Sequence, residues 1–155
     1  MVVTSSDAAN ATLPTTYTCD GEGKSPPVAW SGAPSGTTGY AVLMSTVPSV
    51  GTTKYNWILY NIPAGTTSLA AGASAGTFGF ADDGGGLAYA APCSQGPGLK
   101  QYTFTVYALS AAPNLSGLAP NQVTGAALTS ALSAVTLASA TLTIGVNRTV
   151  AMINC

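Results

Sequence analysis

The sequence contains no histidine and very few charged residues. Four Lys+Arg and five Asp+Glu among 155 residues make 6% charged, with a net charge of −1, whereas about 25% is typical of globular domains. The only cations are Lys24, Lys54, Lys100 and Arg148, too few for the basic face that nucleic-acid binding requires. The absence of histidine excludes Ser-His-Asp and Cys-His nucleophiles and histidine-ligated zinc. With 46% hydrophobic residues and about the length of one domain, we predict one domain over residues 1–155.

A second absence concerns membrane and targeting segments. No charged residue lies between Lys100 and Arg148, and Gly125 to Val146 is long enough to cross a bilayer. That segment is rich in Ser and Thr, and its apolar spacing changes midway from helical to alternating. It therefore predicts a helix followed by a strand, and the chain is not predicted to be transmembrane. The N-terminus lacks a basic region followed by an apolar run, while low Lys with abundant Thr, Ser, Gly and Ala resembles exported proteins. We predict a periplasmic or secreted protein in its mature form, without a signal peptide.

Short apolar segments separated by Gly and Pro predict a mainly β chain. Tyr40–Val47 is nearly all apolar, as in a buried strand, and Trp57–Ile62 is a second such segment, closed by Pro63. Tyr102–Leu109 alternates, with Thr103 and Thr105 on one face. Further predicted strands are 28–30, 141–146 and 149–153, with a strand or tail at 1–12, a loop at 72–86 and one helix at 124–138. This pattern predicts a sandwich of two packed sheets with one late α-helix.

Six blocks of sequence, spread over roughly residues 13 to 146, form a recognisable series. The blocks are Tyr17-Thr-Cys-Asp-Gly21, Ser25-Pro-Pro-Val-Ala-Trp-Ser-Gly32, Tyr40-Ala-Val-Leu-Met44, Trp57-Ile-Leu-Tyr-Asn-Ile-Pro63, Tyr89-Ala-Ala-Pro-Cys93 and Tyr102-Thr-Phe-Thr-Val-Tyr-Ala-Leu109. In order and spacing they resemble the phosphatidylethanolamine-binding protein family, specifically its bacterial Raf-kinase-inhibitor-like branch. The resemblance implies a β-sandwich with a small anion-binding pocket at one end, which in the family receives phosphate-like headgroups or acetate-like ions.

The pocket is where this sequence departs from the family. The family's Asp-Pro-Asp motif corresponds to Thr46-Val-Pro48, and the first pocket histidine corresponds to Asn56. The second histidine precedes an Arg-Tyr pair, where this chain has Lys100-Gln-Tyr102. An imidazole titrates near neutral pH, whereas asparagine offers two donors and one acceptor at every pH. We therefore predict a less charged pocket for a neutral or weakly anionic small molecule. Its predicted lining is Thr46, Pro48, Tyr55, Asn56, Pro92, Lys100 and Tyr102.

Three cysteines permit one disulfide and leave one thiol over. Cys19 and Cys93 belong to blocks that lie near the pocket rim in the family, so the resemblance favours a Cys19–Cys93 disulfide. Pairing of either residue with Cys155, or three free thiols, stays open. Cys93 is not predicted to be a nucleophile, because no histidine is present to activate it.

The acidic residues and the glycine run give no evidence of a cofactor. Asp20 and Glu22, with Asp82 and Asp83, lack the ordered oxygen spacing of a calcium loop. The run Gly84-Gly-Gly86 lacks the lysine of a phosphate-binding loop. Solvated turns explain both segments, so we predict no metal and no cofactor.

The favoured hypothesis is a non-catalytic module that binds a small polar or anionic ligand or inhibits a partner protein. By analogy with the family, that partner would be a kinase or a protease, and a low-charge surface is compatible with a homodimer. One alternative is an enzyme that uses the pocket as a shaped cavity or uses Lys100 as an acid or base. Another is a structural protein with a vestigial site.

Overall fold

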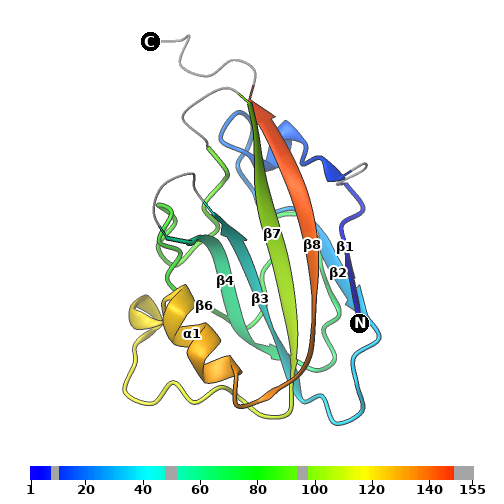
Figure 1. The fold of residues 1–155 in the computed structure, drawn as a ribbon, viewed down its shortest axis with the longest axis vertical. Coiled ribbons are helices and arrows are strands. Elements are labelled where there is room, and N and C mark those ends of the chain that lie inside the picture. The colour runs from blue at the N-terminus through cyan, green and yellow to red at the C-terminus, as the bar shows by residue number, and fades with distance from the viewer. Residues whose placement is uncertain (8–10, 48–51, 94–97, 149–155) are drawn as a thin grey trace.

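The structure is a computed structural model that describes residues 1–7, 11–47, 52–93 and 98–148. Its larger sheet is antiparallel, with the strand order β6-β4-β3-β7-β8. The five strands are β3 (Gly39–Thr46), β4 (Lys54–Pro63), β6 (Thr77–Phe78), β7 (Gly98–Leu109) and β8 (Thr136–Arg148). In Figure 1, β7 and β8 form the longest pair of strands.

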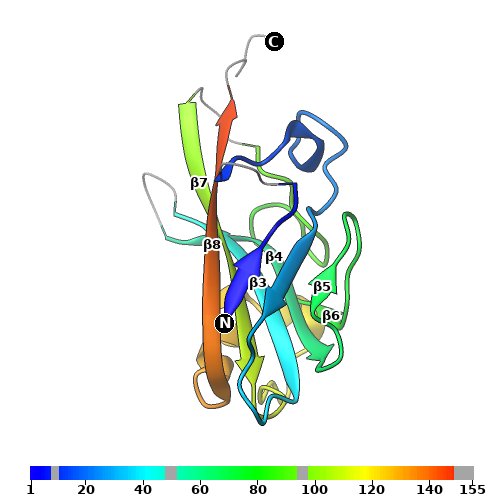
Figure 2. The ribbon, with the colours of Figure 1, turned by 90° about the vertical axis from the view of Figure 1, so that its right-hand side faces the viewer.

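A smaller sheet packs on one face of the larger sheet (Figure 2). Its antiparallel order is β1-β2-β5, with β1 at Val2–Thr4, β2 at Val28–Ser31 and β5 at Ser68–Leu69. Two 3₁₀ turns, Thr15–Tyr17 and Pro120–Gln122, and the helix α1 (Gly125–Leu132) complete the described elements. The predicted fold, two packed sheets with one late helix, is confirmed.

The main core lies between the two sheets. We call the face of the larger sheet that contacts this core its inner face. The inner face contributes Met44 from β3, Trp57 from β4 and Phe104 from β7, and the smaller sheet contributes Val28 and Trp30. Phe104 and Met44 have no exposed surface. The alternation predicted for β7 is confirmed, because Tyr102, Phe104 and Val106 are buried while Thr103 and Thr105 are half-buried on the other face.

A second core lies between the outer face of the larger sheet and α1 (Figure 1). Leu128 and Leu132 of α1 pack there with Leu43 of β3 and Ile58 of β4. Since β3 contributes side chains to both cores, both of its faces are buried. This explains why Tyr40–Met44 is apolar throughout, whereas Val47, predicted to belong to the same buried strand, lies beyond β3 and is exposed.

The predicted helix was too long. The helix begins after Thr124, whose hydroxyl accepts the Ala127 N–H at 3.1 Å, and it ends at Leu132 instead of Ala138. From Thr136 the chain is already strand β8, because this segment pairs with the whole length of β7. The β-branched Val135 and Thr136 favour that change, since they lose rotamer freedom in a helix.

Other boundaries also differ from prediction. The predicted strand 141–146 is the middle of β8, which runs from Thr136 to Arg148. The predicted loop 72–86 contains the short strand β6. The predicted strand 149–153 lies outside the described residues. Within the described ranges, no helix has the length and apolarity needed to cross a bilayer.

Substitution of Gly125 tests the packing of α1. A Cβ atom at this position would lie 2.2 Å from the Tyr55 ring, so Gly125→Ala should destabilise the fold by about 1–3 kcal/mol through overpacking. Helix propensity alone predicts the opposite sign, with alanine better by about 1 kcal/mol. Urea unfolding measures the change, and the added variant Tyr55→Ala should restore most of the loss. A Gly125→Ala protein more stable than the parent would contradict this packing.

Candidate binding site

A β-bulge sets the position of Asn56 at one end of the inter-sheet core. Met44 pairs with Trp57, but the next residue, Ser45, pairs with Tyr55, so Asn56 is an extra residue in β4. A bulge redirects the side chains on either side of it. Here Trp57 packs in the inter-sheet core and Tyr55 packs on the α1 side. Asn56 itself is completely buried.

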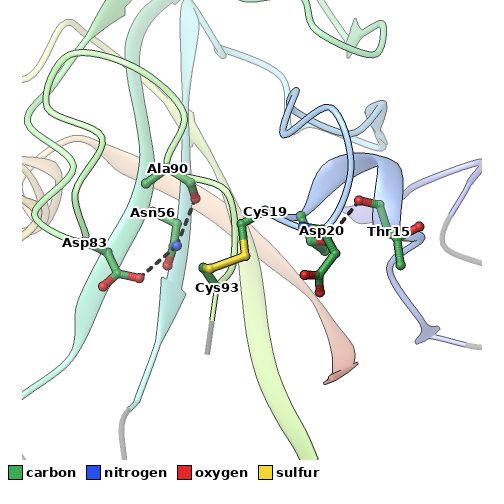
Figure 3. The surroundings of a disulfide bond; sticks show 8 residues. Thr15, Cys19, Asp20, Asn56, Asp83, Ala90 and Cys93 are labelled. Carbon is green, nitrogen blue, oxygen red and sulfur yellow. Dashed lines mark hydrogen bonds between the residues drawn. A yellow bond between two sulfur atoms is a disulfide. The ribbon is translucent and has the colours of Figure 1, made fainter. Parts of the chain in front are cut away.

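Both amide hydrogens of Asn56 have protein acceptors. Nδ2 donates to Asp83 Oδ2 at 3.0 Å and to the Ala90 carbonyl at 2.9 Å (Figure 3). In return, the Ala90 N–H donates to the Asn56 carbonyl at 2.7 Å. The Oδ1 atom, however, is buried and has no hydrogen-bond partner among the described residues. An unsatisfied buried acceptor costs about 1–3 kcal/mol.

Three more predicted site residues gather at this end of the inner face. Thr46 follows Met44 by two positions and Lys100 precedes Tyr102 by two, so their side chains share the inner face. Thr46 is buried, and its hydroxyl donates to the Gln101 carbonyl at 2.8 Å. Lys100 Nζ lies 5.7 Å from the centroid of the Tyr102 ring, which is within the range of a cation–π contact. We call Thr46, Lys100 and Tyr102, together with Asn56 of the adjacent bulge in β4, the inner-face cluster.

A chain of aromatic contacts lies beside the inner-face cluster. Tyr89 packs edge-on against Trp57 with ring centroids 5.6 Å apart, and its hydroxyl donates to the Tyr17 carbonyl at 2.8 Å. Burial, with a smaller contribution from Tyr102, raises the pKa of Tyr89 above its ordinary value. Tyr89 therefore stays neutral and keeps donating this hydrogen bond at physiological pH.

The disulfide Cys19–Cys93 joins two loops next to the cluster (Figure 3). Its Cα atoms are 5.4 Å apart and the cysteines are 74 residues apart in sequence. The Cys19 N–H also donates to the carbonyl of the buried Pro92 at 3.1 Å. The loop that carries Ala90 and Pro92 is thereby held at both ends, by the disulfide and by Asn56.

The other predicted site residues do not belong to the inner-face cluster. Tyr55 lies on the opposite face of the sheet, against Gly125 of α1, and so not on the face that carries Thr46 and Lys100. Pro48 lies outside the described residues, as does Cys155. Lys54, which was not predicted, pairs with Thr46 and so lies on the neighbouring strand at the same end of the sheet.

Two hollows in the described surface lie elsewhere. One of about 130 Å³ is lined by Tyr40, Asn61 and Leu109, among others, and one of about 350 Å³ lies over β1, β2 and β5. Neither contains a member of the inner-face cluster. No group of three or more Cys, Asp and Glu among the described residues is arranged to hold a metal ion.

Sequence reasoning missed the role of Asp83 and Tyr89. Asp83 was assigned to a solvated turn, yet its carboxylate orients the Asn56 amide. Tyr89 begins the block Tyr89–Cys93 of the family resemblance, but no role was predicted for it. Asp83 contacts Asn56 through the bulge in β4, whereas Tyr89 contacts Trp57 and the Tyr17 carbonyl. A bulge depends on the register of two strands, which the sequence of one strand does not reveal.

Loss of the disulfide should destabilise the protein. The double variant Cys19→Ser/Cys93→Ser is expected to lose about 4 kcal/mol of unfolding free energy, because the crosslink no longer restricts the unfolded chain. Chemical denaturation with and without reductant measures the loss. Cys155→Ser is the control and should leave the stability unchanged. Equal stability of the double variant and the parent would contradict a stabilising crosslink.

Alkaline pH should weaken the contact between Tyr17 and Asp7. The Tyr17 hydroxyl donates to Asp7 Oδ2, and this hydrogen bond, with burial and the nearby carboxylates, raises the pKa of Tyr17 to about 12. The unfolded-state pKa is about 10, so the stabilisation is complete below pH 10 and is lost as pH rises towards 12. Thermal unfolding between pH 8 and 12 tests this.

The matched variant for this experiment is Asp7→Asn, which removes the carboxylate. Its Tyr17 should ionise at lower pH, as measured by tyrosinate absorbance against a Tyr17→Phe reference. An unchanged titration in Asp7→Asn would show that Asp7 does not set the pKa of Tyr17.

Solved structures share this arrangement of strands over nearly the whole chain. A candidate phosphatidylethanolamine-binding protein homologue from Chlamydia trachomatis superposes with a TM-score of 0.82 at 25% identity, covering 95% of this chain and 97% of that one. Escherichia coli YbcL is described as a new member of the mammalian PEBP family. It superposes with a TM-score of 0.80 at 26% identity, covering 94% of this chain and 97% of that one.

Sequence relatives and a family model agree with the structural likeness. A UPF0098 protein of Methanothermobacter thermautotrophicus is 33% identical over 103 residues, 63% of this chain and 68% of that protein. A candidate lipoprotein of Mycobacterium tuberculosis, LppC, is 34% identical over 110 residues, 70% of this chain and 54% of that protein. The chain thus spans between about half and two thirds of the length of these curated relatives. The family model for phosphatidylethanolamine-binding protein matches residues 3–147, so the chain belongs to the phosphatidylethanolamine-binding protein family.

Proposed function

We propose that residues 1–155 form one domain, a non-catalytic binding module that holds a small polar ligand at the inner-face cluster. The observation that carries the proposal is the buried Oδ1 of Asn56, which has no hydrogen-bond partner among the described residues. The indole N–H of Trp30, in the inter-sheet core, is also without a partner there. A ligand that supplies the missing donor to Asn56 would offset the cost of burying that oxygen.

Lys100 supplies the charge with which the site would meet an anionic group. Its side chain is half-buried and lies against the Tyr102 ring. Lys54, opposite Thr46, adds a second cation at the same end of the sheet. Phosphate and carboxylate groups are the natural partners of such ammonium groups.

The residues of the cluster favour binding over catalysis. Asn56 has no proton to exchange at any pH, and Thr46 uses its hydroxyl on a backbone carbonyl. The chain has no histidine to activate a nucleophile. A catalytic role would fall to Lys100, which lies against the Tyr102 ring and forms no ion pair with a carboxylate in the part of the chain that the structure describes.

We further propose that the protein acts outside the cytoplasm. Disulfides persist in oxidising compartments, and Cys19–Cys93 is such a bond between exposed residues. The relative named as a candidate lipoprotein supports the same location.

Thermal unfolding in the presence of phosphoethanolamine, phosphate or acetate tests the ligand hypothesis. At a concentration a hundredfold above the dissociation constant, a ligand should raise the melting temperature by roughly 5–10 °C. Lys100→Ala should reduce that rise, because the cation beside Tyr102 is lost. Lys24→Ala is the matched control, since Lys24 is 3.7 Å from Glu22 in a surface ion pair. Stabilisation by none of the three compounds would reject the proposal.

A further inference from the structure

We infer that the outer edge of β8 is a self-association surface, on which a second copy of this chain pairs its own β8 antiparallel about a two-fold axis at Thr141. Figure 2 looks onto this edge, with β8 in front of β7. The sequence was compatible with a homodimer but did not indicate its interface. The paired residues are distinct from the inner-face cluster, so the inference does not depend on the proposed function.

The backbone of β8 is paired along its length on one side only. Its antiparallel ladder with β7 extends over the whole strand. On the other side, Gly145 forms a parallel bridge with Thr12, and the Leu13 N–H donates to the Gly145 carbonyl at 3.0 Å. The described residues give this side of β8 no other backbone pairing. Most of this edge is therefore open to another strand.

The same bridge shows which residues of β8 direct their backbone groups outward. The Gly145 carbonyl points away from β7, and in an antiparallel strand this direction alternates from residue to residue. The N–H and C=O groups of Ser139, Thr141 and Thr143 therefore also point away from β7. The hydroxyl oxygens of Thr103 and Thr143 lie 3.3 Å apart across the two strands. Such closeness is typical of a pair that is not hydrogen-bonded through its backbone, in agreement with this direction.

The edge of β8 lacks the features that normally prevent pairing. Sheet edges are usually protected by charged residues, by proline or by very short strands. No Lys, Arg, Asp, Glu or Pro lies between Thr136 and Asn147. The other edge strands of the two described sheets are short, since β5 and β6 have two residues each and β1 has three. With thirteen residues, β8 is the edge that offers a second strand a long, uncharged template.

A second copy of β8 matches the two rows of side chains on this strand. One row consists of the exposed hydroxyl residues Ser139, Thr141 and Thr143. The other row includes Ala140 and Leu142, which are half-buried against the inter-sheet core. A two-fold axis at Thr141 places Ser139 opposite Thr143 of the second copy, so hydroxyl faces hydroxyl. It also places Ala140 opposite Leu142, so apolar faces apolar, and cross-strand pairs of both kinds are favourable.

This register is compatible with the pairing that β8 already has. Thr141 pairs with its own copy, and Ser139 pairs with Thr143 on either side of the axis. Each of these three pairs exchanges two backbone hydrogen bonds. The ladder ends there, because the next outward-pointing residue, Gly145, is already bonded to Leu13. Since a ladder of three pairs is shorter than a standard interface requires, we expect dimer and monomer to be in exchange.

Sedimentation equilibrium of the intact protein from about 1 µM to about 1 mM tests the inference. We expect reversible dimerisation that depends little on ionic strength, because no charged group lies in the paired rows. Amide exchange at Ser139, Thr141 and Thr143 should slow as the protein concentration rises. A protein that stays monomeric would overturn the inference and leave the edge to a different extended chain. Dimerisation without slower exchange at these amides would also overturn it, by placing the interface elsewhere.

Charged substitutions at Thr141 test the position of the two-fold axis. Thr141→Lys and Thr141→Glu each bring two like charges together on the axis, so each should weaken dimerisation at least about tenfold. An equimolar mixture of the two variants should associate again, because opposite charges then meet. Thr67→Lys is the matched control at an exposed threonine of the smaller sheet's loop and should dimerise like the parent. A mixture that fails to associate, or an equal loss in Thr67→Lys, would contradict pairing at Thr141.

Discussion

The burial of β3 on both faces is the constraint on which the other layers depend. Its side chains alternate between the core shared with the smaller sheet and the core beneath α1. A strand in that position has to be apolar along nearly its whole length. Its neighbours β4 and β7 then place their own alternating residues on the same two faces. The polar residues Thr46 and Asn56 occur only where this strand and its neighbour reach the end of the core.

The position of the proposed site depends on the bulge and the loop that cover that end of the core. The bulge in β4 lets Asn56 hold the loop that carries Asp83 and Ala90, and the disulfide holds the same loop at Pro92 and Cys93. The disulfide and the hydrogen bonds of Asn56 thus hold a segment that forms no helix or strand. The loop therefore lies against the buried Asn56 side chain and is held in a fixed position there.

The fold could be predicted because its signals are local. Alternation in Tyr102–Leu109 and continuous apolarity in Tyr40–Val47 follow from which faces of a strand are buried. The end of α1 could not be predicted in this way, since Ser133 to Ala138 is compatible with a helix until β7 is present to pair with it. Thr46, Asn56, Lys100 and Tyr102 were predicted to line a pocket through the family resemblance. The structure brings Thr46, Lys100 and Tyr102 to one end of the inner face, next to the bulge that carries Asn56, and their role in binding stays a prediction. Tyr55 was predicted beside them, but the extra residue in β4 turns the side chain that precedes it to the opposite face of the sheet.

The Cys19–Cys93 bond also determines how the molecule would carry tension. Residues 20–92 form a closed covalent loop that contains β2 to β6, strands of both sheets. A pulling force applied to the chain on either side of this loop would pass directly from Cys19 to Cys93. The enclosed strands β2 to β6 would bear no stretching through their own backbone, whereas β1, β7 and β8 would be loaded. Under tension the molecule would therefore extend only in the segments outside the loop, and the enclosed segment could be lengthened only after reduction of the disulfide.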